Sequence, residues 1–214
     1  ANAALLMLAL GGRDARADEF CVGTVGELNA ALIVAATPNP GTTTIRLKQG
    51  FYAVGSSRMT QVGQAYFNAL ELLGGYNADC STRTINPDNT VFDANGAQRF
   101  RFDPLGDLLI EGIRFQDIGN VRQVHIWPAG SSLDVRVRNN AFVGVGFLIR
   151  PGSTPDGGFV EGSSLRFVNN RVVENTPSGN PSVFIADQTQ VRVIGNTIAD
   201  NEGVDGVLLC GNGL

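Results

Sequence analysis

The sequence predicts an all-β protein, a right-handed, single-stranded parallel β-helix with a short capping helix near its N-terminus. Composition is the first reason: 43% of the 214 residues are hydrophobic, 27 are Gly and only 17% are charged. Such a chain is too apolar for disorder and too rich in glycine for a helical bundle. The second reason is that short apolar phrases recur from Phe100 onward. The third is that Asn or Gly follows many of these phrases, and both residues tolerate the positive φ of a sharp bend.

Residues 1–17 have the features of a secretory leader. An apolar run from Ala3 to Leu10 precedes the small-residue pattern Ala15-Arg16-Ala17, directly ahead of Asp18, as at a signal-peptide cleavage site. Because an initiator Met and a basic n-region are lacking, we expect the printed sequence to start inside this leader. A short buried helix is the alternative.

Residues 18–42 are predicted to form an N-terminal capping segment. Thr24 and Glu27 stand at capping-box spacing, ahead of apolar residues at helical intervals, namely Leu28, Ala31 and Leu32. We therefore expect a short helix that ends before Pro38. Cys21 and Cys80 flank this segment and either close a disulfide across it, leaving Cys210 over, or remain buried thiols with Cys210.

Residues 43–214 are predicted to form the β-helix, cut off before the solenoid is complete. Thr44 to Tyr52 alternates apolar and polar residues as one strand does. Leu214 follows directly after an inward-pointing strand, so we expect further coils beyond it.

Two phrases alternate along the β-helix. The first is apolar, any residue, apolar: Phe100-Arg101-Phe102, Val124-His125-Ile126, Phe147-Leu148-Ile149, Val183-Phe184-Ile185 and Val207-Leu208-Leu209. The second ends at a small polar corner: Leu108 to Gly112, Val135 to Asn140, Leu165 to Asn170 and Val191 to Asn196. After each corner the chain returns to an apolar residue, in turn Phe115, Phe142, Val172 and Ile198.

The repeat predicts stacked coils. Ile110, Val137, Phe167 and Val193 are the equivalent inward positions, and their uneven spacing of 26 to 30 residues indicates loops of variable length. Short strands bury an apolar face only by stacking at about 4.8 Å per rung. The corner amides would then stack as well, Asn139 on Asn169, and Asn140 on Asn170 and Asn196. A β-sandwich and a β-propeller are the competing folds.

With these residues, the sequence resembles the right-handed β-helix proteins of the pectate-lyase-like superfamily, especially exported bacterial ones. The resemblance covers most of residues 20–214 and rests on the Asn-Asn coils and on four phrases: Glu27 to Leu32, Thr44 to Tyr52, Leu72 to Tyr76 and Thr90 to Gly96. The superfamily includes polysaccharide lyases, glycoside hydrolases, adhesins and uncharacterised surface proteins, so the resemblance implies a carbohydrate-related or surface role. It supplies no catalytic residues, because the paired Asp and His/Arg/Lys motifs of pectin hydrolases and the arginine-and-calcium pattern of pectate lyases are missing. The one Arg-Pro pair, Arg150-Pro151, lacks the other members of a lyase motif.

Three arginines occupy one outward position of consecutive coils: Arg136, Arg166 and Arg192. Guanidinium groups bind carboxylates with two parallel hydrogen bonds, so this column predicts a groove for an acidic polysaccharide such as a uronan. The alternative is that the side chains spread into water or pair with neighbouring acids.

A second column is acidic. Asp117, Glu174 and Asp200 each fall two residues after the returning apolar position, while Gly144 takes that place in one coil. Two such carboxylates on adjacent rungs would share Ca²⁺ or perform acid/base chemistry; a solvated acidic edge is the alternative. No cofactor is required, and Ca²⁺ is the candidate ion.

The remaining candidates lie beside the longest insertion, Arg150 to Ser164, whose glycines and prolines predict a projecting loop. Arg150 joins the proposed ligand-binding residues, as does Trp127. The single histidine, His125, lies two positions before Trp127. An ordinary surface pair is the favoured interpretation, and a role as a base or in stacking on a sugar is the alternative.

These observations favour an exported protein, secreted, periplasmic or on the outer cell surface, that binds polysaccharide or serves in adhesion without catalysis. The alternatives are a lyase or hydrolase whose active-site residues lie partly elsewhere, and a structural segment of a larger surface protein. The net charge of −4 and pI near 5.0 disfavour nucleic acid as a partner, and no stretch of the mature part predicts a transmembrane segment.

Overall fold

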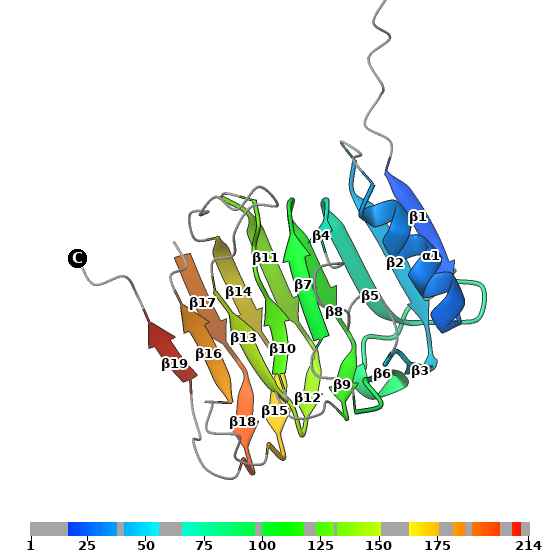
Figure 1. The fold of residues 1–214 in the computed structure, drawn as a ribbon. Coiled ribbons are helices and arrows are strands. Elements are labelled where there is room, and N and C mark those ends of the chain that lie inside the picture. The colour runs from blue at the N-terminus through cyan, green and yellow to red at the C-terminus, as the bar shows by residue number, and fades with distance from the viewer. Residues whose placement is uncertain are drawn as a thin grey trace, which may run out of the picture.

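The computed structural model describes residues 17–37, 41–55, 66–96, 100–117, 123–130, 132–150, 163–175, 182–186, 190–201 and 207–210. Most of the proposed leader, the loop after Arg150 and Leu214 lie outside these ranges. Figure 1 shows parallel strands stacked along one axis, from β1 and α1 at one end to β17, β18 and β19 at the other. The chain forms a β-solenoid of about 5 turns, which confirms the predicted parallel β-helix.

Each coil contributes one strand to each of three parallel sheets. Sheet A consists of β1 (Asp18–Val22), β2 (Thr43–Lys48), β5 (Leu70–Tyr76), β8 (Leu108–Glu111), β11 (Asp134–Arg138), β14 (Ser164–Val168) and β17 (Gln190–Ile194). Sheet B consists of β3 (Gly50–Ala53), β6 (Thr90–Asp93), β9 (Arg114–Gln116), β12 (Ala141–Val143), β15 (Arg171–Val173) and β18 (Thr197–Ala199). Sheet C consists of β4 (Tyr66–Phe67), β7 (Phe100–Pro104), β10 (Gln123–Ile126), β13 (Gly146–Ile149), β16 (Val183–Ala186) and β19 (Val207–Cys210).

The two repeated phrases occupy different sheets. The first phrase forms sheet C, in which Phe100, Val124, Phe147, Val183 and Val207 stack in register. The second forms sheet A, where Ile110, Val137, Phe167 and Val193 stack as predicted. The returning apolar residues form the inner file of sheet B. Period-two alternation thus places one set of side chains inside and the other outside.

The interior is filled by stacked rings. Phe115 stacks on Phe142, with centroids 5.4 Å apart, and Phe142 contacts Phe147 and Phe167. Tyr52 extends this core at the first coil, and its hydroxyl donates to the carbonyls of Val22 and Lys48. Because the phenol is buried, its pKa is raised to about 12.

The corners between sheets A and B contain two kinds of Asn. Asn139 and Asn169 have positive φ, of 56° and 57°, and Gly112 and Gly195 take this place in the neighbouring coils. Asn140, Asn170 and Asn196 form a ladder, of which Asn140 and Asn170 are buried. The side-chain oxygen of Asn170 accepts from the backbone N–H of Asn140, and that of Asn196 accepts from the backbone N–H of Asn170. Both predicted Asn stacks are therefore present.

The N-terminal end is closed by one helix, α1 (Val25–Ala35), which packs against β1 and β2. Its capping box is present: Thr24 accepts from the backbone of Glu27, and the Glu27 carboxylate accepts from Thr24. Leu28, Ala31, Leu32 and Ala35 are buried beneath the helix. The helix prediction is confirmed, whereas β1, which adds a strand to sheet A ahead of the helix, was not predicted.

The predicted single strand from Thr44 to Tyr52 was wrong in extent. The chain turns at Gly50, where φ is +153°, so β2 belongs to sheet A and β3 to sheet B. Alternation alone does not reveal this corner, because the apolar pattern continues on both sides of it.

Residues 77–89, which connect β5 to β6, form a segment that we call the strap. It contains the short 3₁₀ helix η2 (Pro87–Asn89). Cys80 in the strap forms a disulfide with Cys21 on β1, one of the two alternatives the sequence left open. The strap lies so close to β5 that a Cβ at Gly75 would be 2.1 Å from the Thr84 carbonyl oxygen, which explains a glycine there.

Candidate functional site

The three candidate arginines lie on the outer face of sheet A. Arg136 on β11 is in register with Arg166 on β14, and Arg166 with Arg192 on β17. Their neighbours along each strand, such as Val135 and Val137, point into the core and fix the outward direction of the arginines. We call these three residues the arginine file.

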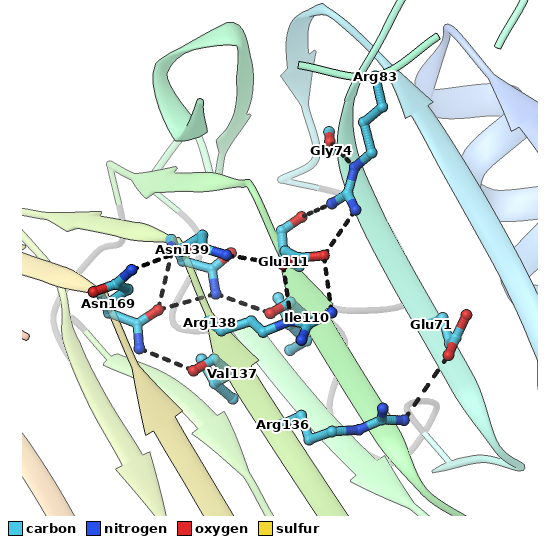
Figure 2. A network of polar contacts seen from close by, with 12 residues as sticks. Glu71, Gly74, Arg83, Ile110, Glu111, Arg136, Val137, Arg138, Asn139 and Asn169 are labelled. Atoms are coloured by element: carbon cyan, nitrogen blue, oxygen red, sulfur yellow. Dashed lines mark hydrogen bonds and ion pairs between the residues drawn. The ribbon is translucent and has the colours of Figure 1, made fainter. Parts of the chain in front are cut away.

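The file is already neutralised at its N-terminal side. The Arg136 guanidinium lies 3.6 Å from the Asp134 carboxylate and 3.9 Å from that of Glu71, toward which it points in Figure 2. The same Asp134 oxygen lies 3.5 Å from Arg166. Arg136 is therefore engaged with acids of its own chain, which is the alternative that the sequence had offered for the whole column.

The C-terminal side of the file is different. Arg166 and Arg192 line a pocket of about 90 Å³ together with Ser164, Leu165 and Gln190. The Arg166 side chain is 56% exposed, and Arg192 is exposed as well. Among the described residues, Arg192 has no carboxylate within ion-pair distance. Two guanidinium groups and a carboxamide thus line one outward pocket as donors suited to an anion, whereas the Ser164 hydroxyl is directed at the Leu133 carbonyl, at 3.3 Å, and the Asp134 carboxylate, at 3.2 Å.

Trp127 and Arg150 are brought together, but on sheet C and apart from the arginine file. The Arg101 guanidinium lies over the indole at 4.0 Å and that of Arg150 at 4.5 Å, each from a neighbouring coil. Arg101 also pairs with the buried Asp103 at 2.8 Å. Two arginine side chains of the same protein thus cover the Trp127 ring, which leaves less of its surface for stacking on a sugar.

His125 was wrongly predicted to be a surface residue. It lies in the outward file of sheet C between Arg101 and Leu148, yet only 6% of it is exposed. Its ring contacts that of Trp127, with centroids 5.8 Å apart. The larger indole and the neighbouring side chains cover it, an outcome of packing that alternation does not reveal.

The acidic column has a backbone explanation. Asp117, Glu174 and Asp200 have φ values of 52°, 60° and 56°, and Gly144, in the equivalent place, has 67°. These residues therefore make the left-handed corner between sheets B and C. Within the described ranges, no group of three or more His, Cys, Asp or Glu side chains is placed to hold a metal ion. Ca²⁺ shared by two carboxylates on adjacent rungs stays a prediction.

The most connected polar group escaped the sequence reasoning. Glu111, at the end of β8, has a side chain only 4% exposed, although it points to the outer face of sheet A. It lies 2.7 Å from Arg83 of the strap and 2.8 Å from Arg138, and it accepts from Asn139 at 2.8 Å (Figure 2). The repeated phrases do not predict this cluster, because Arg83 belongs to the strap and not to a repeated phrase.

The charges around Glu111 determine its ionisation. Burial raises the pKa of this carboxyl, but the hydrogen bond and charge of Arg83, together with Asn139 and Arg138, outweigh burial and hold the pKa below its ordinary value of 4.5. Arg83 also donates to the Gly74 carbonyl, at 2.9 Å. The cluster therefore fastens the strap to sheet A, which is a structural role.

No family model, curated protein or solved structure matches this chain. Within the described residues, no helix has the length and apolarity to cross a membrane. The candidate function therefore rests on the geometry of the site.

Proposed function

We propose that this chain is an exported β-helix protein that binds an acidic polysaccharide on the outer face of sheet A, without chemical turnover. The pocket between Arg166 and Arg192 carries the proposal, since it combines two exposed guanidinium groups with Ser164 and Gln190. A carboxylate bound there would receive charge-assisted hydrogen bonds from one or both arginines.

The repeat of the solenoid supports a polymeric ligand. Arg166 and Arg192 are in register on adjacent strands, so their Cα atoms are separated by about 4.8 Å along the axis. A uronan presents one carboxylate per sugar residue, and an extended chain of this kind would lie along the stacking direction. The binding free energy would come from several weak, exposed contacts, and it would therefore fall with added salt.

Export is proposed on two grounds. The Cys21–Cys80 disulfide is typical of proteins from oxidising compartments, outside the cytosol. The apolar run from Ala3 to Leu10, ahead of the small-residue pattern, is typical of a secretory leader. A polysaccharide ligand also agrees with the resemblance to pectate-lyase-like proteins.

Titration calorimetry with polygalacturonate, alginate and chondroitin tests the proposal. We expect binding to at least one of them, a loss of at least about tenfold in affinity in the Arg166→Ala/Arg192→Ala double variant, and weakening by salt. The Arg114→Ala/Arg171→Ala double variant is the matched control, because it removes two positive charges from the outer face of sheet B. It should bind as the wild type does, provided that circular dichroism shows it folded.

Two outcomes would overturn the proposal. The first is that none of the three glycans binds, or that both double variants lose affinity equally. The second is release of unsaturated products or new reducing ends during incubation, which would show a lyase or a hydrolase instead of a binding protein.

A further inference from the structure

The arginine file contains a carboxylate of its own. Asp134 lies on the strand of Arg136, two residues before it, and its carboxylate reaches the guanidinium groups of Arg136 and Arg166 at 3.6 and 3.5 Å. It therefore bridges two adjacent rungs of the file. With 30% of its side chain exposed, Asp134 stays on the surface, where a bound anion would also lie.

The next coil repeats this arrangement without the acid. Asp134 is in register with Ser164, and Ser164 with Gln190. Moving one rung along the solenoid thus replaces the pair Arg136 and Arg166 by Arg166 and Arg192, and replaces Asp134 by Ser164. At the second position there is a pocket, in which the uncharged Ser164 and Gln190 lie beside Arg166 and Arg192. Asp134 reaches only its edge, where the Ser164 hydroxyl donates to the carboxylate at 3.2 Å.

We propose that Asp134 is a specificity-determining residue, an internal carboxylate that occupies the first of two equivalent anion seats. The first seat lies between Arg136 and Arg166, and the second, between Arg166 and Arg192, is left for the ligand. Asp134 thereby limits the number of uronate carboxylates that the file binds. This inference rests on the proposed function, and it adds the chemical class of the ligand group and the extent of the site.

Emptying the first seat should enlarge the site. The Asp134→Ser variant copies the residue of the next coil and removes the carboxylate that Arg136 and Arg166 share, while Arg136 keeps the Glu71 carboxylate at 3.9 Å. We expect its affinity for galacturonate oligomers of two to six residues to rise about three- to tenfold, as one additional exposed carboxylate–guanidinium contact would give. Monomeric galacturonate, with one carboxylate, should gain at most about twofold, because a second seat on the same face doubles only the statistical weight.

Glu71→Gln is the matched control. It removes one negative charge from the same face of sheet A and from a partner of Arg136, but it leaves Asp134 in the first seat. The dependence of affinity on oligomer length should be that of the wild type. Asp134→Ala serves as a second variant, and circular dichroism with thermal unfolding verifies the fold of all three.

The outcomes separate the two proposals. If the wild type binds no galacturonate oligomer or polymer, the role of Asp134 fails, and the proposed function fails with it only when alginate and chondroitin do not bind either. If the wild type binds but the Asp134 variants gain no more than Glu71→Gln, or gain equally for monomer and oligomer, only the role of Asp134 is overturned. A gain that grows from monomer to oligomer in both Asp134 variants supports the proposal.

Discussion

Two adjacent asparagines at one corner do different work. Asn169 faces outward and adopts a positive φ, a conformation that Gly195 takes in the next coil. Asn170 faces inward, where its side chain donates to the Val137 carbonyl and accepts from the Asn140 backbone. The outer residue is needed for its backbone conformation, and the inner one for the partners it gives to buried backbone groups.

These roles predict that substituting the two residues changes the free energy of unfolding by different amounts. Asn170→Ala leaves a buried N–H and a buried carbonyl without partners, and should lower the free energy of unfolding by about 2–4 kcal/mol. Asn169→Gly keeps the positive φ and should change it by less than about 0.5 kcal/mol. Urea denaturation measures both, and equal losses would contradict the assignment.

At the scale of the element, the strap holds separate coils together. Cys80 joins it to β1, Arg83 joins it to β8, and Asp88 pairs with Arg114 on β9 and Arg171 on β15. One connection of residues 77–89 therefore contacts strands on both sides of its own coil. This bracing explains why an acid, Glu111, is tolerated in an almost fully buried place.

The Glu111 cluster predicts a pH dependence of stability. Because the folded-state pKa lies below its ordinary value of 4.5, the stabilisation is fully present above pH 4.5 and is lost as the pH falls through the folded pKa. Glu111→Gln should lower the free energy of unfolding by about 3 kcal/mol at pH 7, as loss of one partner of a buried ion pair does. This difference from the wild type should shrink on acidification.

Chemical denaturation at a series of pH values between 7 and 3 measures this difference. Asp79→Asn, in the same strap, is the comparison variant: Asp79 is exposed, away from the cluster, and its hydrogen bonds from Ser81 also lower its pKa. Its gap from the wild type shows how much pH dependence an exposed, hydrogen-bonded carboxylate gives, and the Glu111 gap should exceed it. If the free energies of unfolding of the wild type and Glu111→Gln differ by the same amount at pH 3 and at pH 7, ionisation of Glu111 does not stabilise the fold.

At the scale of the whole molecule, each coil is stabilised by the coils on either side of it. The ring stack from Phe115 through Phe142 to Phe167 crosses three coils, and the Asn ladder crosses three coils at the corner, beginning and ending one coil further toward the C-terminus. Such a molecule is quasi-one-dimensional, and its stability is a sum of contacts between nearest neighbours. Contacts that join distant parts of the chain, as the disulfide does, are therefore important for the N-terminal end.

The disulfide closes a loop over 59 residues, from the first strand across the first coil to the strap. The chain-entropy relation gives about 4 kcal/mol for a loop of this length. The Cys21→Ser/Cys80→Ser double variant should lose about this much in guanidinium denaturation. Dithiothreitol should destabilise the wild type by a similar amount and leave the double variant unchanged; a wild type insensitive to reduction would contradict the prediction.

Much of this architecture is determined by the sequence itself. Apolar residues at every second position and a polar corner after each phrase place Ile110, Val137, Phe167 and Val193 in one inward file, because a strand has a period of two and the coils repeat. The same register puts the three arginines in one outward file. The capping box determines where α1 begins, because it depends on residues three positions apart.

Only the tertiary structure decided which charges remain available. Arg136 is engaged by Asp134 and Glu71, Glu111 is enclosed by Arg83, and Trp127 is covered by Arg101 and Arg150. The physical reason is that a repeat fixes backbone register, whereas ion pairs depend on where long side chains from different coils and connections meet. Of the three arginines aligned by the sequence, Arg166, which shares Asp134 with Arg136, and Arg192 line the pocket.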